Sequence, residues 1–264
     1  MRRTPMGRTG WIGAFAAFGC AALAACADSS SGGRPAALPP QATVDLSQAT
    51  VFLELNATDE DLGIHSLFDG EGWTRMTIVA PNGVVIFSVT NGGTLSRIGS
   101  TEVFTESAEP PFSVLPPRDF LALFPEGTYT FDGLTVGGRR LVGRFDLDHQ
   151  MPSMPVIDTT PPPDSVSASG PLTIQWTLDP ILPGGGALMG GADIEKLQVI
   201  VDQTDPLDVD PQLILSVDLP AGATEFTVPA GVLVAGREAK VEVLAIGENG
   251  NKTAAELGIG MVQP

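Results

Sequence analysis

The sequence predicts an all-β protein made of two β-sandwich domains in tandem, with one short helix in the first domain. Short apolar runs that alternate with polar residues recur from residue 49 onward, which is the pattern of half-buried strands. Glycine and asparagine separate many of these runs, as expected for tight turns. A proline-rich stretch near residues 151–163 interrupts the pattern and predicts two domains, at 44–152 and 153–264.

The first predicted domain contains two hairpins and a helix. Asn82-Gly83 supplies the positive φ angles of one hairpin turn. The other predicted pair of strands, 128–131 and 141–147, is connected across Gly137-Gly138. The helix is predicted over 117–124, because Pro117 stands at its start, Phe120 and Phe124 are four residues apart, and Pro125 follows. The strands predicted in this domain are 50–56, 75–79, 84–89, 128–131 and 141–147.

The second predicted domain starts after extended, proline-rich connectors at 151–155 and 160–163. Six or seven strands within about 110 residues predict a β-sandwich. The strands are expected at 172–178, 197–201, 213–217, 225–228, 239–246 and 254–262.

Residues 156–262 resemble a fibronectin type III domain. The similarity rests on a proline-bearing first strand, Trp176 on the second strand, the valines at 241 and 243, and the turn at 248–251. It implies that Trp176 is a core residue between two sheets and that the domain is a spacer or binding module. Two features depart from the family: Ala239 replaces the tyrosine of the usual corner, and residues 183–191 form a glycine-rich insertion.

The first domain resembles the N-terminal regions of uncharacterised exported bacterial proteins that precede such a module. The similarity rests on the segments 69–73, 105–110 and 124–129. It implies no activity.

The N-terminal residues resemble a bacterial lipoprotein signal. Three arginines are followed by an apolar stretch at 11–23 and by Leu23-Ala24-Ala25-Cys26. The resemblance implies cleavage after residue 25, acylation of Cys26, a flexible tether over 26–43 and a membrane anchor. Asp28 stands one place later than the family's inner-membrane retention position, so we expect an outer-membrane protein facing the periplasm or the surface. The alternative is an ordinary secretory signal in which Cys26 is incidental.

Composition excludes several partners and kinds of site. The formal net charge of −17 disfavours nucleic acid. The sequence has two cysteines, and one of them, Cys20, lies within the predicted signal. The processed chain would therefore have no disulfide and no thiolate metal site.

Calcium is the only cofactor that the sequence suggests, and no other is predicted. Asp59, Asp61, Asp69 and Glu71 offer several carboxylate oxygens within thirteen residues, and calcium takes six to eight oxygen ligands. The alternative is that these residues are ordinary turn formers, because their spacing is not that of a twelve-residue calcium loop.

No enzyme is predicted. The two histidines, His65 and His149, are expected in plain strand or surface roles, and no Gly-x-Ser-x-Gly elbow occurs. We therefore expect a membrane-anchored, non-catalytic binding or scaffold module whose partner is an unknown protein or polysaccharide. One alternative is an accessory protein that recognises polysaccharide or peptidoglycan through Trp73, Tyr129 and Phe112. The other is a hydrolase in which a histidine meets a carboxylate and a serine.

Overall fold

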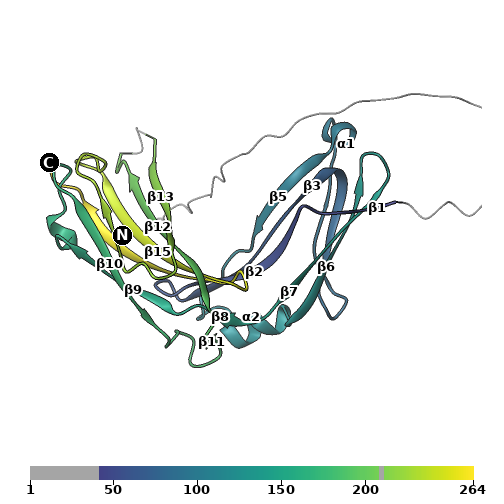
Figure 1. Cartoon of the computed structure of the whole chain (residues 1–264), viewed down its shortest axis with the longest axis horizontal. Helices are drawn as coiled ribbons and strands as arrows, with labels where there is room; N and C mark the ends of the chain where they lie inside the picture. The colour runs from purple at the N-terminus through teal and green to yellow at the C-terminus, as the bar shows by residue number, and fades with distance from the viewer. Residues whose placement is uncertain (1–41, 208–210) are drawn as a thin grey trace, which may run out of the picture. The chain divides into compact units, whose positions relative to one another are not determined.

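The computed structural model describes residues 42–207 and 211–264, and its fold is all-β (Figure 1). The strands up to residue 151 are β1 (Thr43–Asp45), β2 (Gln48–Asn56), β3 (Asp61–Val79), β4 (Val85–Thr90), β5 (Ser100–Glu106), β6 (Gly127–Thr135), β7 (Arg140–Leu147) and β8 (Gln150–Met151). The strands after residue 151 are β9 (Met154–Thr160), β10 (Leu172–Asp179), β11 (Met189–Gly190), β12 (Ile194–Thr204), β13 (Leu213–Pro220), β14 (Glu225–Val228), β15 (Glu238–Gly247) and β16 (Lys252–Met261).

The helical segments of the described residues are short. They are α1 (Leu95–Ile98), α2 (Pro117–Leu123) and the 3-10 turn η1 (Pro163–Ser165). The predicted helix is confirmed as α2, which has proline in its first turn and buries Phe120 and Leu121. Within the described ranges, no helix has both the length and the apolar character needed to cross a membrane.

The long strand β3 organises the N-terminal part. Its residues 61–69 pair with β2, its residues 65–69 also pair with β5 on the other side, and its residues 75–79 pair with β4 and β6. The path of this sheet runs β1-β7-β6-β3-β2. One face of these strands forms the first core, in which Leu53, Phe68, Trp73 and Tyr129 are fully buried.

Tyr129 makes a corner contact at the start of β6. Its hydroxyl donates to the carbonyl oxygen of Pro125 at 3.0 Å, four residues upstream. Burial raises the pKa of this phenol to about 12. It is the one tyrosine of the sequence. The N-terminal part therefore has a hydrogen bond from a tyrosine hydroxyl to the backbone just upstream, which Ala239 cannot make in the C-terminal part.

The C-terminal part is a two-sheet sandwich. Strands β14, β10 and β9 form one sheet, and β16, β15, β12 and β13 form the other (Figure 1). Side chains from both sheets meet in the second core, which includes Ile174, Trp176, Val199 and Val243. One expectation from the fibronectin type III resemblance is confirmed here: Trp176 is buried between the sheets.

The two parts are joined by strand pairing. Residues 54–56 of β2 pair in parallel with residues 252–254 of β16, so a single eleven-stranded sheet includes strands of both parts. The Asn251 side chain, which is fully buried, fastens this junction. Its Oδ1 accepts from the Leu53 N–H at 2.8 Å, and its Nδ2 donates to the carbonyl oxygens of Asp148 and Gln150 at 3.0 and 2.9 Å.

The glycine-rich insertion of the C-terminal part also contacts the N-terminal part. Leu182 and Leu188 belong to the first core, and β11 pairs in parallel with β8. A Cβ atom at Gly184 would lie 2.9 Å from Pro117 of α2, so close packing requires glycine there. Residues 40–264 form one compact unit, and the domain boundary at 152/153 stays a prediction.

Two local expectations are corrected. In the turn between β3 and β4, Gly83 alone has a positive φ angle, of 84°, whereas the Asn82 side chain accepts from the Val84 N–H. Asp69 and Glu71, expected in a turn, lie within β3. Because β3 is held by partner strands on both sides, polar and glycine residues stay in the extended conformation.

Candidate functional site

A buried polar cluster lies where β2, β3 and the segment after β5 meet. We call Glu54, His65, Glu109 and Lys252 the His65 cluster. On β2, Leu53 and Leu55 enter the first core, so Phe52 and Glu54 project from the opposite face, here called the outer face. Strand pairing then places His65 of β3 opposite Phe52.

His65 is the centre of the cluster. It is 2% exposed, and its Nε2 lies 2.9 Å from Oε1 of Glu109. Its ring stacks on Phe52 at 5.0 Å and lies 5.6 Å from the ring of Phe104. Its Nδ1 is buried and has no hydrogen-bond partner. The strands therefore hold the imidazole between two aromatic rings, with Nε2 directed at a carboxylate.

Glu109 reaches His65 because the backbone leaves room for it. Its φ angle is +47°, which is uncommon for a residue other than glycine. Its side chain lies across Gly63, where a Cβ atom would be 2.5 Å from Cγ of Glu109. Since Gly63 pairs with Glu54, the missing side chain brings the two carboxylates to the same place on the outer face.

Glu54 and Lys252 connect the cluster to β16. Lys252 Nζ lies 3.2 Å from Oε2 of Glu54 and 4.3 Å above the ring of Phe52. Glu54 is 14% exposed and Lys252 15% exposed. Among the described residues, Glu54, His65 and Glu109 form the one group of three potential metal-ligating side chains, with their donor atoms all within 4.8 Å of one another.

The outer face continues onto β15 with a second polar group. Glu242 pairs directly with Glu256, which accepts from Lys240 Nζ at 2.8 Å and from Asn56 Nδ2 at 3.3 Å. Burial, together with the negative charges of Glu256 and Glu54, raises the pKa of Glu242 to about 8. Four glutamates and two lysines therefore share this region of the sheet.

The structure does not bring the four predicted calcium ligands together. Asp59 lies in the turn before β3 and accepts from Asn56, whereas Asp61 begins β3. Asp69 lies eight residues further along the extended strand, about 26 Å away, and accepts from the Ser47 hydroxyl. Glu71 is paired with Arg139. Asp59 and Asp61 therefore lie apart from Asp69 and Glu71 along the length of β3.

Neither histidine forms a catalytic triad. The ring nitrogen Nε2 of His65 contacts Glu109 and its Nδ1 has no partner, so no serine joins this pair. Nε2 of His149 lies 2.8 Å from the Phe124 carbonyl oxygen, which acts as an acceptor. Within residues 42–207 and 211–264, these contacts provide no serine nucleophile beside a histidine base.

The aromatic residues considered for a polysaccharide face are mostly covered. Trp73 and Tyr129 are fully buried in the first core, and Phe112 is only partly buried against it. Of the exposed large apolar side chains in the described residues, Phe104 is the one aromatic. These residues therefore offer no row of exposed rings on a sheet face.

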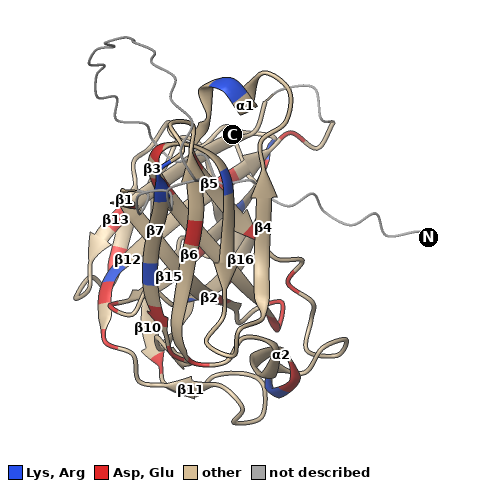
Figure 2. Ribbon diagram, turned by 90° about the vertical axis from the view of Figure 1, so that its right-hand side faces the viewer, with Lys and Arg blue, Asp and Glu red and all other residues tan. Residues whose placement is uncertain are grey.

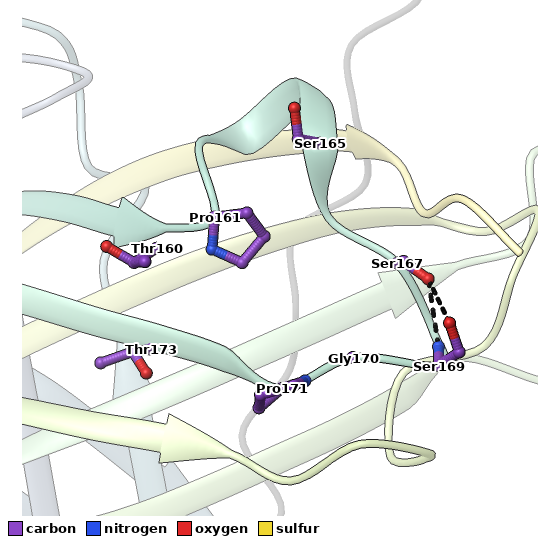
Figure 3. Close-up of a pocket in the computed structure, with 8 residues that line it drawn as sticks. All are labelled: Thr160, Pro161, Ser165, Ser167, Ser169, Gly170, Pro171 and Thr173. Carbon is purple, nitrogen blue, oxygen red and sulfur yellow. Dashed lines mark hydrogen bonds between the residues drawn. The ribbon is translucent and has the colours of Figure 1, made fainter.

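A surface depression in the C-terminal part is lined by small side chains only. It encloses about 460 Å³ beside η1 and the start of β10 (Figure 3). Ser165, Ser167 and Ser169 line it, and the hydroxyls of Ser167 and Ser169 lie 2.8 Å apart. No charged or aromatic side chain lines the depression, so it lacks the groups that bind a metal ion or stack on a sugar.

The predicted lipidation residue, Cys26, lies outside the described residues, as do the rest of the predicted signal and most of the tether. Charged residues of the described part are spread over many strands and do not form one block (Figure 2).

The contact between His65 and Glu109 was not predicted from the sequence, because the two residues are 44 positions apart. The signal that it offered was a histidine inside the alternating stretch of 62–68, opposite a predicted strand.

No protein-family model and no curated protein sequence matches the chain. Several solved structures are similar to it, among them the following two. The fn3 domain of the human collagen alpha-1(XX) chain is 20% identical, with a TM-score of 0.27, and the match covers 42% of this chain and 87% of that domain. The FN1–FN3 domains of chicken CNTN1 are 9% identical, with a TM-score of 0.31, and the match covers 85% and 69%. At such TM-scores the fold assignment rests on the strand pairing and the cores described above.

Proposed function

We propose that the chain is an exported lipoprotein anchored through Cys26, and that its all-β body is a non-catalytic binding or scaffold module. The anchor is supported by the sequence alone: basic residues, an apolar stretch and Leu23-Ala24-Ala25-Cys26 follow one another in the order of a lipoprotein signal. Two or more acyl chains would hold the protein firmly at a membrane.

The scaffold part is supported by the junction at Asn251. A fully buried amide side chain bonds three backbone groups from two other segments, one at Leu53 and one at 148–150, and the Thr253 hydroxyl adds a bond to the Pro152 carbonyl at 2.8 Å. Such contacts resist independent movement of the segments that they join, because each broken bond leaves a buried polar group unsatisfied. A body joined in this way is suited to present a surface at a membrane, and its partner is an unidentified protein or polysaccharide.

Acylation is tested with matched cysteine variants. Cells expressing wild-type protein, Cys26→Ser or Cys20→Ser are fed a fatty acid with an alkyne tag, and the purified protein is examined for the tag and for the mass of its N-terminal peptide. We expect label on wild-type protein and Cys20→Ser and none on Cys26→Ser. An unmodified N-terminal end in the wild type, or label that persists in Cys26→Ser, would contradict the anchor.

The non-catalytic part is tested separately on the purified full chain with ester, glycoside and peptide substrates. We expect no turnover above that of a buffer blank. Turnover that disappears in Glu109→Gln, which removes the carboxylate facing His65, would contradict the proposal and favour the hydrolase alternative.

A further inference from the structure

We propose that Glu54, His65 and Glu109 bind a divalent transition-metal ion of the zinc class. The site is independent of the acyl anchor, because its three residues come from β2, β3 and the segment after β5. The donor set decides the class of ion. An imidazole nitrogen with two carboxylates suits zinc and its neighbours in the first transition row, whereas calcium and magnesium prefer oxygen ligands alone.

The donor atoms are already close together. All three lie within 4.8 Å of one another, and Nε2 of His65 is 2.9 Å from Oε1 of Glu109. Ligands of a tetrahedral zinc ion at about 2.1 Å stand roughly 3.4 Å apart. The histidine and Glu109 therefore need to separate by only about half an ångström, and Glu54 needs to approach by about 1.4 Å at most. Side-chain rotation supplies displacements of that size without a change in the strands.

The surroundings of the three donors favour a bound cation. Glu109 and Glu54 are 19% and 14% exposed, so their charges are only weakly screened by water. Glu256 adds a third carboxylate nearby, and Lys240 and Lys252 offset two of the three negative charges of Glu54, Glu109 and Glu256. Lys252 contacts Oε2 of Glu54, and the other oxygen of that carboxylate can take the ion.

The histidine can ligate once its proton moves from Nε2 to Nδ1. In the ion-free protein Nε2 donates to the Glu109 carboxylate, which only accepts. An ion that takes the place of this hydrogen bond leaves the proton on Nδ1, which has no hydrogen-bond partner. The N–H at Nδ1 then has no acceptor. Because histidine ligands normally donate this proton, and loss of that contact costs about 10–100-fold in affinity, we expect moderate affinity.

The experiment follows the two histidines of the chain by NMR. Full-length, ¹⁵N-labelled protein with alkylated thiols is stripped with chelator, and Zn²⁺ is added while the imidazole signals are recorded. His149→Gln assigns the two rings. We expect the His65 signals to shift with a stoichiometry of one ion per chain and the His149 signals to stay unchanged.

Isosteric variants identify the carboxylate ligands without disturbing the buried imidazole. Glu109→Gln and Glu54→Gln should each require at least 10-fold more Zn²⁺ for half-saturation, while Glu60→Gln, an exposed neighbour, should match wild type within twofold. The thermal midpoint of each ion-free variant verifies that it is folded. Three results would overturn the proposal: no shift of His65 at 1 mM Zn²⁺, wild-type binding by both Glu109→Gln and Glu54→Gln, or an equal response to Ca²⁺.

Discussion

Replacing Glu242 with glutamine should stabilise the protein, and the gain should increase with pH. Glu242 projects from β15 onto the outer face, directly opposite Glu256. Glu256 and Glu54 disfavour its negative charge, whereas Lys240 and Lys252 favour it, and burial is the largest cause of its raised pKa. Glutamine keeps the shape of the side chain and has no proton to lose.

The sign and the size of the effect follow from the pKa. It rises from 4.5 to about 8 on folding, so the folded protein retains a proton that the unfolded chain releases. Stability from this group is therefore full below pH 4.5 and is lost as the pH rises toward 8. Between pH 5 and pH 7.5 the wild type should lose about 3 kcal/mol through this residue, and Glu242→Gln should lose none of it.

Denaturant unfolding of wild type and Glu242→Gln at pH 5 and pH 7.5, in buffer with chelator, measures this difference. The difference in free energy of unfolding between the two proteins should grow by about 3 kcal/mol across the interval. Glu238→Gln, an exposed glutamate on the same strand, should change stability by less than about 0.5 kcal/mol at either pH. A gap between wild type and Glu242→Gln that stays constant with pH would refute the electrostatic argument.

Three further substitutions test the packing. Asn251→Ala should lower the free energy of unfolding by about 3 kcal/mol, because the buried Leu53 N–H loses its partner and the carbonyls of Asp148 and Gln150 each lose one bond. Asn249→Ala, whose amide is partly exposed, should cost about 1 kcal/mol, and equal costs would contradict the role of Asn251. Tyr129→Phe should cost about 1 kcal/mol in thermal or denaturant unfolding through loss of its hydroxyl bond, and a neutral result would show that the corner contact does not stabilise the fold. Gly63→Ala should cost about 1–3 kcal/mol, because a Cβ atom would lie 2.5 Å from Cγ of Glu109, and a crystal structure with Glu109 unmoved would contradict this reason.

Most strands could be predicted because alternation reports a buried face directly. Residues 239–246 alternate between the second core and the outer face, and they form β15 almost as expected. The helix at 117–124 was predictable for a local reason, since proline at its start and two phenylalanines four apart need no information from elsewhere in the chain.

The first two-thirds of β3 could not be predicted from local pattern. Asp69, Gly70 and Gly72 are typical of a turn, yet pairing with β2 and β5 keeps residues 61–69 extended. The calcium hypothesis rested on four acids within thirteen residues of sequence, whereas the strand holds Asp61 and Asp69 apart. Tertiary pairing overrode residue preference here.

The His65 cluster depends on two contacts between residues far apart in the sequence. Glu109 approaches His65 across 44 residues, and Lys252 approaches Glu54 across 198 residues. The space for these contacts comes from a glycine, which has no donor atom of its own to mark the site. A search for metal-ligand spacing in the sequence therefore finds nothing at His65.

The hydrogen bond from the Leu53 N–H to the Asn251 side chain affects the order in which the chain can fold during synthesis. The two residues are 198 positions apart, so during synthesis the Leu53 N–H has no Asn251 acceptor until nearly two hundred further residues have been added. A nascent chain halted before residue 251 leaves the N–H of Leu53 and the carbonyls of Asp148 and Gln150 without this partner. The N-terminal strands therefore complete their internal contacts only together with strands made much later.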